Sequence, residues 1–508
     1  MVARIHTIAF QGIDALNIDV QVTFTPGLPA FTVVGLPDKA VGESRERVRA
    51  ALNGLGLSLP AKRITVNLSP ADVLKEGSHF DLPIALGLLV SMNVLSSAEL
   101  QEYIVLGELA LDGSLLPVNG VLPTAIAASA QDKGLICPEA CGQEAAWAGD
   151  IRILAPKHLL ALINHFKGTQ ILPIPQRANI PQQKFNLDMR DVKGQEMAKR
   201  AFEIAAAGAH NILMLGPPGA GKSMLAARMP TILPDLEPEE ALEISMIQSV
   251  AGLISEGHIQ RARPYRAPHH SASLAAMVGG GPNAKPGEIS LSHHGVLFLD
   301  ELPEFSRATL EALRQPIETG SISVARVNAH VTYPARVQLI AAMNPCKCGY
   351  LSNPGLACGR APKCGQDYQA KISGPILDRI DLHLDLPAVK IDDLHLPPAK
   401  EGSAEIRERV RLAREKQKQR YLELAPHLKI RTNAAIDDGL LREIAQPDPE
   451  GRKMLERAAD KFNFSARGYH RLLRVARTIA DLENEDHIRL THIAEAISYR
   501  KISMMQAA

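Results

Sequence analysis

The sequence is poor in aromatic residues, since Phe, Tyr and Trp together make up 4% of its 508 residues. A surface that stacks successive nucleic-acid bases on aromatic rings would therefore have few rings to use. The sequence also lacks any run of about 18 uncharged apolar residues, so we expect no membrane span. Its first residues, MVARIHTIAFQGIDAL, do not have the pattern of a secretory signal. We therefore expect a cytoplasmic protein without a membrane partner.

No sign of charge dominates, because 56 Lys and Arg residues face 55 Asp and Glu residues. The bulk charge thus gives no attraction for nucleic acid, although a local basic surface, such as the inside of a ring, is not excluded. Six cysteines in a cytoplasmic chain of this length do not indicate a disulfide framework. A chain this long exceeds a single core and predicts two to four domains.

Three blocks of different pattern divide the chain. Residues 1–168 alternate short strand-like and helix-like stretches, which predicts an α+β domain. Residues 169–186 are rich in Pro, Gln and Asn and have no acidic residue, which is typical of a linker. Residues 187–390 have an α/β pattern, and residues 391–508 are predicted to be helical.

The strongest motif is HNILMLGPPGAGKSMLAARMP, in which an apolar strand leads into a glycine-rich loop. A helix follows, which we expect to end at Pro230. In this setting the backbone N–H groups of the loop surround phosphates, a lysine reaches the β- and γ-phosphates, and a hydroxyl binds Mg²⁺. An ordinary Gly-rich turn is the alternative, but it does not explain the flanking strand and helix. The predicted ATP-binding residues are Gly216, Pro217, Pro218, Gly219, Ala220, Gly221, Lys222 and Ser223, the last also a magnesium ligand.

Two carboxylates follow an apolar strand in HHGVLFLDELPEF and support the same site. We predict that Asp300 holds Mg²⁺ through water, and that Glu301 orients and deprotonates the attacking water. Asn344 ends a third apolar strand, VQLIAAMN, where its amide can bridge the γ-phosphate and that water. Each of these segments alone would also fit a solvated turn, so the complete loop upstream is what favours catalysis.

Together these residues resemble the AAA+ ATPases, specifically the Mg-chelatase-like branch of the ComM type. The resemblance extends over nearly the whole chain through VVGLPDKAVGESRERVRAAL, RPYRAPHHSAS, GEISLSHHGVLFLDELPEF, ALRQPIETG, SGPILDRIDLH and RGYHRLLRVARTIADL. It implies an AAA+ core with a helical lid, and ATP bound between the subunits of a ring, expected to be a homo-hexamer. It also implies that Asn344 senses the γ-phosphate, that Arg379 is an arginine finger for a neighbour's ATP, and that Arg467 is a second sensor on the lid.

The resemblance implies a motor that moves on single-stranded and branched DNA. Such a motor would drive branch migration in natural transformation and homologous recombination, together with other recombination proteins. Two alternatives remain open: a chelatase-type ATPase that remodels proteins and, more remotely, an ATP-dependent peptidase.

Two insertions in the α/β block are candidates for contact with DNA. Residues 253–281 carry Arg263 and Arg266, and residues 320–337 have the pattern of a hairpin with Arg326 and His330 near its tip. In related ring motors such insertions project into the pore, where cationic side chains can contact a phosphate backbone. A surface hairpin with scattered charges is the alternative.

Four of the six cysteines fall within nineteen residues and could hold Zn²⁺, although free thiols are the alternative. These are Cys346, Cys348, Cys358 and Cys364. Two pairs of adjacent histidines are not expected to bind metal, because neighbouring residues point in different directions: His269 with His270, and His293 with His294.

The segment KEGSHFDLP, residues 75–83, resembles the active-site loop of Lon-type peptidases. In that resemblance the nucleophile position falls on His79, and the position of the base lysine, in LGELALDGSLLPVNGVLP, falls on Leu122. Ser78 lies one residue away, but an unassisted serine hydroxyl is a weak nucleophile near pH 7. The resemblance therefore implies a Lon-like fold, that of ribosomal protein S5 domain 2, without the peptidase dyad.

Overall fold

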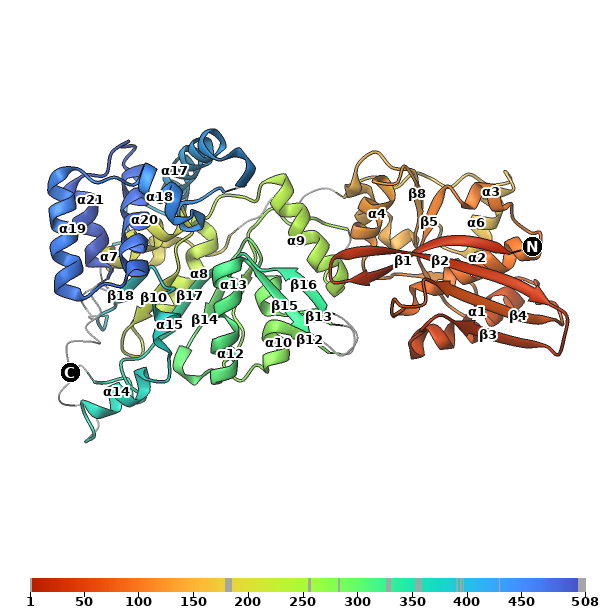
Figure 1. Cartoon of the computed structure of the whole chain (residues 1–508), viewed down its shortest axis with the longest axis horizontal. Helices are drawn as coiled ribbons and strands as arrows, with labels where there is room; N and C mark the ends of the chain where they lie inside the picture. Colours follow the sequence, from red (N-terminus) through yellow and green to blue (C-terminus); the bar gives the residue numbers. More distant parts are fainter. Residues whose placement is uncertain are drawn as a thin grey trace.

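The structure is a computed structural model. It describes residues 2–178, 185–254, 257–281, 284–325, 330–351, 355, 359–389, 392, 395, 397–428 and 430–500. The first block lies at one end of the long axis and the nucleotide-binding and helical blocks at the other (Figure 1). In the part of the chain so described, no helix is long and apolar enough to cross a membrane.

The first block is a mixed seven-stranded sheet with the order β3-β4-β2-β1-β5-β8-β9. Its strands are β1 (Ala3–Gln11), β2 (Asp14–Thr25), β3 (Ala30–Val34), β4 (Arg63–Ser69), β5 (Tyr103–Val105), β8 (Gly134–Ile136) and β9 (Ile153–Leu154). Its helices are α1 (Lys39–Gly54), α2 (Asp81–Ser91), α3 (Ser97–Leu100), α4 (Val121–Ser129), α5 (Gly142–Ala145) and α6 (Leu159–Phe166). The apolar stretch 103–109 forms two strands, because the Gly107 N–H turns away to bond the His79 carbonyl; β6 (Glu108–Leu109) then pairs with β7 (Leu115–Leu116).

The nucleotide-binding block is a parallel five-stranded sheet with the order β11-β14-β17-β10-β18. Its strands are β10 (Ile212–Leu215), β11 (Tyr265–Arg266), β14 (Val296–Leu299), β17 (Gln338–Met343) and β18 (Leu382–Asp385). Strands of a parallel sheet are usually covered on both faces. Every residue of β14 and β17 is accordingly buried, and all but Gln338 are apolar. The surrounding helices are α7 (Glu196–Gly208), α8 (Lys222–Ile232), α9 (Pro238–Ala251), α10 (Leu274–Val278), α11 (Glu288–Leu291), α12 (Arg307–Ala312), α13 (Arg314–Thr319), α14 (Lys363–Gln369) and α15 (Gly374–Leu377).

One local expectation differs from the structure. Helix α8 does not end at Pro230 but continues to Ile232, because Thr231 and Ile232 are buried in the core. Two pairs of short antiparallel strands lie at the insertions. At the end of the first insertion, β12 (Gly279–Gly280) pairs with β13 (Lys285–Pro286), and within the second, β15 (Ser321–Ala325) pairs with β16 (His330–Pro334). The second hairpin was expected from the sequence.

The C-terminal block is helical and packs against α7. It comprises α17 (Ser403–Leu424), α18 (Asp438–Ile444), α19 (Pro449–Phe462), α20 (Ala466–Leu482) and α21 (Leu490–Ser498). One apolar cluster runs continuously from Met189 of the nucleotide-binding block to Tyr499 of the helical block. The lid is thus joined to the sheet through a shared core, which confirms the predicted α/β core with a helical lid.

The first block contacts the nucleotide-binding block through α4 and α9. The Glu144 carboxylate accepts from the Leu122 N–H (3.0 Å) and from the Ser249 hydroxyl (2.6 Å), and the Gly120 N–H donates to the Ser249 carbonyl (3.1 Å). Burial, despite these two hydrogen bonds, raises the pKa of Glu144 above its ordinary value. Leu122 is the position at which a peptidase would carry its lysine. Here its N–H group binds the carboxylate that connects the two blocks, so Leu122 belongs to their interface.

Candidate nucleotide-binding site

The glycine-rich loop connects the end of β10 to the start of α8. Gly219 and Gly221 adopt positive φ angles of 76° and 78°, which side chains rarely tolerate. The loop can therefore turn its N–H groups toward a phosphate at the N-terminus of α8. Gln195, which the sequence did not single out, donates to the Ala220 carbonyl (2.7 Å) and supports the loop from the segment before α7.

Lys222 is the first residue of α8 and is buried. Its ammonium donates to the carbonyls of Gly216 (2.8 Å) and Pro217 (2.9 Å) and to Asn344 Oδ1 (3.0 Å). Burial lowers the pKa of Lys222 below its ordinary value, while the nearby carboxylates of Asp300 and Glu301 oppose this shift. Parallel strands bring their carboxyl ends to one edge, so the structure gathers Lys222, Asn344 and Asp300 at the ends of three strands.

Ser223 and Asp300 form a pair suited to a magnesium ion. The Ser223 hydroxyl donates to Asp300 Oδ2 (2.7 Å), and the Glu301 N–H donates to Asp300 Oδ1 (2.9 Å). Hydroxyl and carboxylate oxygens are the hard ligands that Mg²⁺ prefers, usually in combination with phosphate oxygens and water. The two side chains therefore fit the ion that the sequence predicts.

Glu301 lies directly after β14 in the left-handed region, with φ 51°, and is exposed. A non-glycine residue in this region is uncommon, and such strain is concentrated at functional sites. Its Oε2 atom lies 3.4 Å from His270 Nδ1, and the His270 ring also contacts Phe305. His270 comes from the insertion before α10, so this contact links the insertion to the predicted catalytic base, and no spacing in the sequence indicates it.

The main chain of Arg379 lies at the end of β10 opposite the phosphate loop of its own chain, and Arg467 lies near Arg379. The Arg379 carbonyl accepts from Asn211 Nδ2 (3.2 Å), and Asn211 precedes β10, whereas the loop leaves β10 at its other end. Four strand residues span roughly 13 Å. Arg467, in the first turn of α20, lies 3.7 Å from the Glu318 carboxylate, which also pairs with Arg379.

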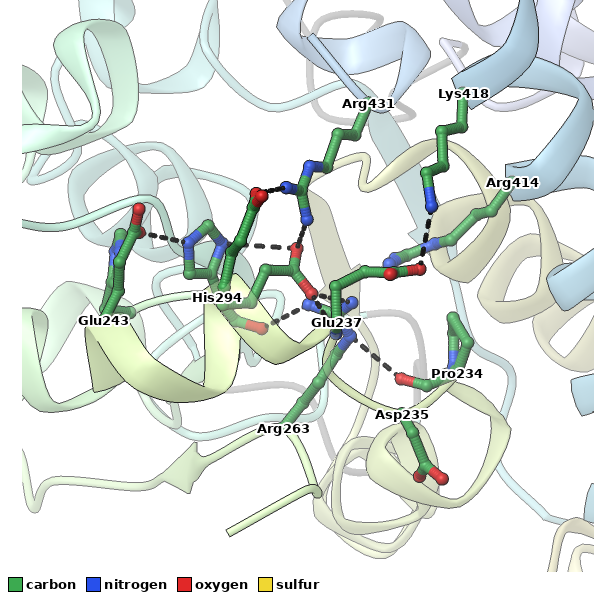
Figure 2. Close-up of polar contacts among 12 residues, drawn as sticks. Pro234, Asp235, Glu237, Glu243, Arg263, His294, Arg414, Lys418 and Arg431 are labelled. Carbon is green, nitrogen blue, oxygen red and sulfur yellow. Dashed lines mark hydrogen bonds and ion pairs between the residues drawn. The ribbon is translucent and has the colours of Figure 1, made fainter. Parts of the chain in front are cut away.

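Among the residues predicted to contact DNA, Arg263 is hydrogen-bonded within its own chain. Its guanidinium donates to the Pro234 carbonyl (3.0 Å), the His294 carbonyl (2.8 Å) and Glu240 Oε2 (2.8 Å), and its side chain is 9% exposed. Figure 2 shows it at the centre of ion pairs between α9 and the lid, with Arg431 and Lys418 on the lid side. These contacts hold the Arg263 guanidinium within the fold, and its contact with DNA stays a prediction.

The other predicted DNA contacts are less constrained by the fold. Arg266 is 39% exposed and forms a bidentate pair with Glu288 (2.6 and 2.7 Å). Arg326 lies outside the described residues, as does the side chain of His330. The contacts of these residues with DNA stay predictions.

The cysteine-rich loop is described in part. The sulfurs of Cys346 and Cys348 lie 3.1 Å apart, and Cys364 lies on α14, whereas Cys358 is outside the described residues. The structure thus places two of the four cysteines side by side, and the zinc site stays a prediction.

The expectation that adjacent histidines point apart is wrong for His293 and His294. Both rings contact Glu243 Oε2 through Nε2, at 2.9 and 2.8 Å, because His294 has a φ of 53° and turns its ring alongside the first. Among the described residues, these three form a group close enough to share a metal. However, the Arg336 N–H donates to His293 Nδ1 (3.0 Å), which leaves the proton on Nε2. A protonated Nε2 cannot ligate a metal, so hydrogen bonding to Glu243 accounts for this group.

The loop of residues 75–83 has the contacts of a structural turn. The Ser78 hydroxyl donates to the Glu108 carboxylate, and buried His79 contacts the Ile8 carbonyl through Nε2 (2.9 Å). Burial lowers the pKa of His79 below its ordinary value, which favours a neutral ring. A Ser-Lys peptidase needs a lysine that accepts the proton of the serine hydroxyl. In the described contacts the Ser78 hydroxyl instead donates to the carboxylate of Glu108.

Three family models match the chain in sequence. "Magnesium chelatase, subunit ChlI" matches residues 188–394, "Subunit ChlI of Mg-chelatase" matches residues 20–141, and "Magnesium chelatase, subunit ChlI C-terminal" matches residues 400–500. Together they cover more than half of the chain and include the loop, both carboxylates, Asn344 and the two arginines.

Relatives match over nearly their full lengths. The chain is 44% identical to the uncharacterized protein YifB of Escherichia coli K12, over 99% of this chain and 97% of that one. It is 42% identical to competence protein ComM of Haemophilus influenzae, over 98% and 97%. The magnesium-chelatase 38 kDa subunit of Rhodobacter capsulatus is 26% identical over 30% of this chain and 49% of its own. The chain therefore belongs to the Mg-chelatase-like AAA+ family, in its ComM-type branch.

Proposed function

We propose that this chain is an ATP-driven motor that forms a ring, expected to be a hexamer, and moves on branched DNA in natural transformation and homologous recombination. The observation that carries the proposal is the separation of the site within one chain. Lys222, Ser223 and Asp300 lie at one edge of the sheet, and Arg379 and Arg467 at the other. This division supports a site that a second copy completes by presenting Arg379 to the first copy's ATP. Arg467, predicted as a second sensor, shares Glu318 with Arg379, and we propose that it acts together with Arg379.

In turnover each side chain would have one task. Lys222 would transfer its hydrogen bonds from carbonyls to the phosphates, and Ser223 and Asp300 would hold Mg²⁺, which neutralises charge on the β- and γ-phosphates. Glu301 would accept a proton from the attacking water, which Asn344 helps to position. The arginines of the neighbouring copy would stabilise the charge that develops on the transferred phosphoryl group, for which a finger contributes about 10³- to 10⁵-fold.

Support for DNA as the track comes from the relatives. The printed name of the Haemophilus influenzae relative is a competence protein, and a stretch of 117 residues is 27% identical to the DNA replication licensing factor mcm6 of Dictyostelium discoideum. The insertion that carries Arg266 also carries His270, which contacts Glu301. DNA bound at this insertion would therefore be linked to the predicted catalytic base through the contact between His270 and Glu301.

The test uses a three-stranded or forked DNA substrate, ATP and the purified chain. We expect strand displacement or branch migration, with an ATPase rate that DNA raises. DNA affinity should fall about 10³-fold between 50 and 200 mM salt if the ring contacts six or more phosphates. An intact ATPase that DNA leaves unchanged, without movement of any strand, would exclude the motor.

A chelatase-type protein remodeller is the second candidate, because all three family models describe a magnesium chelatase subunit. It predicts an ATPase that a partner protein stimulates and DNA does not. The peptidase has less support, since the Ser78 hydroxyl faces a carboxylate. Ser78→Ala should leave ATPase and strand movement within about twofold of wild type, because that hydroxyl has no catalytic partner.

We also propose that Cys346, Cys348, Cys358 and Cys364 hold one structural Zn²⁺. The support is the proximity of Cys346 and Cys348, whose sulfurs would separate only to about 3.8 Å to share a tetrahedral zinc. Elemental analysis should find about one zinc per chain, and Cys346→Ser should lose it. Far less than one zinc in the wild-type chain would reject the site.

A further inference from the structure

Glu318 lies between the two arginines proposed to act in trans, Arg379 and Arg467. It is in the last turn of α13, directly before Gly320 turns the chain into the β15–β16 hairpin. Its Oε1 atom contacts a terminal nitrogen of Arg379 and lies 3.7 Å from a terminal nitrogen of Arg467. Three segments that are far apart in sequence thus meet at one carboxylate.

The environment of Arg379 limits access of a phosphate to its guanidinium. Its side chain is only 4% exposed, and its two terminal nitrogens donate to Glu318 and to the Pro375 carbonyl. Arg467, by contrast, is 65% exposed. A phosphate on a neighbouring copy therefore meets Arg467 directly but can reach the Arg379 guanidinium only if the carboxylate of Glu318 gives way.

Charge explains why both arginines stay at this position. Two guanidinium groups near one another repel, and a carboxylate between them offsets that repulsion. The cluster as a whole keeps one net positive charge, so it still attracts the phosphates of a nucleotide. Nucleotide phosphates carry more negative charge than one carboxylate and compete effectively for both arginines.

We propose that Glu318 is the positioning residue of the trans arginines: it holds Arg379 and Arg467 against their own chain until the phosphates of a neighbour's ATP displace it. The proposal rests on the ring-forming ATPase proposed above, but not on DNA as its track. A ligand shifts an equilibrium only by its differential affinity for the two states. The Glu318 contact therefore sets how much ATP and how many chains are needed before the interface closes.

The test compares Glu318→Gln with wild type and with a matched control, Glu311→Gln. Glu311, on α12, forms an ion pair with Arg314 (2.8 Å), and its carboxylate has an exposure close to that of Glu318, but it contacts neither trans arginine in the described structure. ATP-dependent assembly is followed by sedimentation, and turnover is followed across ATP and chain concentrations.

We expect Glu318→Gln to assemble at an ATP concentration about two- to fivefold lower than wild type, because the carboxylate of this pair is 42% exposed and solvent screens it although Arg379 is buried. Its saturated turnover should stay within about twofold, and Glu311→Gln should match wild type. Glu318→Asp, which keeps the charge on a shorter side chain, should fall between wild type and Glu318→Gln, and it provides the test if the glutamine variant does not fold.

A double variant identifies the arginine as the cause of the shift. With Arg379→Ala as background, adding Glu318→Gln should move the assembly midpoint less than it does in the wild-type background. An unchanged midpoint in the single Glu318→Gln variant, or a saturated turnover reduced tenfold, would overturn the proposal. So would a wild-type turnover per chain that is independent of chain concentration. A chain that assembles and hydrolyses ATP but moves no DNA would overturn the motor and leave the role of Glu318 in place.

Discussion

At the scale of single residues, Lys222 links the most parts of the site. Its ammonium contacts the glycine-rich loop and Asn344, and it lies near the carboxylates of Asp300 and Glu301. Such a group is held before the substrate binds, so its hydrogen bonds need little rearrangement when phosphates replace the carbonyl acceptors.

We expect Lys222→Ala to lower ATP turnover about 100-fold or more, because one preorganised donor to the phosphates is lost. Phosphate release assays measure this, and Lys371→Ala, which removes a lysine paired with Glu304 at the surface, serves as control. Full turnover in Lys222→Ala would show that the site lies elsewhere.

His293 makes stability depend on pH. Burial, only partly offset by Glu243, lowers the pKa of His293 to about 4, against about 6.5 in an unfolded chain. Between these values the unfolded chain binds a proton that the folded chain does not, so the stability that neutral His293 contributes is present above about pH 6.5 and is lost as pH falls toward 4. The loss would approach about 3 kcal/mol.

Chemical unfolding at pH 7 and pH 5 tests this dependence. His293→Gln should show a smaller difference between the two pH values than wild type. Some difference remains, because burial also lowers the pKa of His383, to about 3. The exposed His269, whose ring contacts Ser271, supplies the control His269→Gln, which should keep the wild-type slope. An equal slope in the His293 variant would contradict the assignment.

At the scale of elements, the start of β18 anchors the lid. Buried Asp381 accepts from Arg471 on α20 (2.7 Å) and from the Asn211 N–H (2.9 Å), with His210 nearby. Burial alone would raise the pKa of Asp381, but Arg471, His210 and the Asn211 N–H hold it below its ordinary value. This carboxylate therefore joins the strand, the segment before β10 and the lid helix.

Asp381→Asn should lower the free energy of unfolding by about 3–5 kcal/mol, because Arg471 is left partly buried without its counter-charge. Thermal and chemical unfolding measure the change. The matched variant Asp438→Asn removes a 57% exposed partner of Arg474 and should cost less than about 1 kcal/mol. Equal stability of the two variants would show that the buried pair does not anchor the lid.

At the scale of the whole molecule, the position of Arg379 predicts catalysis across two copies. Arg379→Ala and Glu301→Gln should each lose turnover when assayed alone. When the two are mixed, an Arg379→Ala chain keeps its loop and Glu301 and can receive Arg379 from a Glu301→Gln neighbour. We expect roughly a quarter of the wild-type rate in random rings, since one neighbour pair in four is complete. A mixture as inactive as its components would mean that Arg379 acts within its own chain.

The sequence located the continuous segments of the candidate site. The loop from Gly216 to Ser223 and the strand ending at Asp300 and Glu301 are contiguous motifs, in which backbone geometry and chemistry depend on neighbouring residues. The order of blocks and the lid followed from periodicity for the same reason. The end of α8 did not, because burial of Ile232 outweighed the local effect of Pro230.

The sequence by itself determined that this chain has an AAA+ core, a phosphate-binding loop with its lysine and carboxylates, and a helical lid, because each is encoded in a continuous segment. Only the tertiary structure decided what lies across the fold: His270 at Glu301, His293 and His294 on one carboxylate, and Arg379 and Arg467 at Glu318. These contacts join residues far apart in the chain or depend on a single backbone angle. Packing and charge, rather than sequence spacing, determine them.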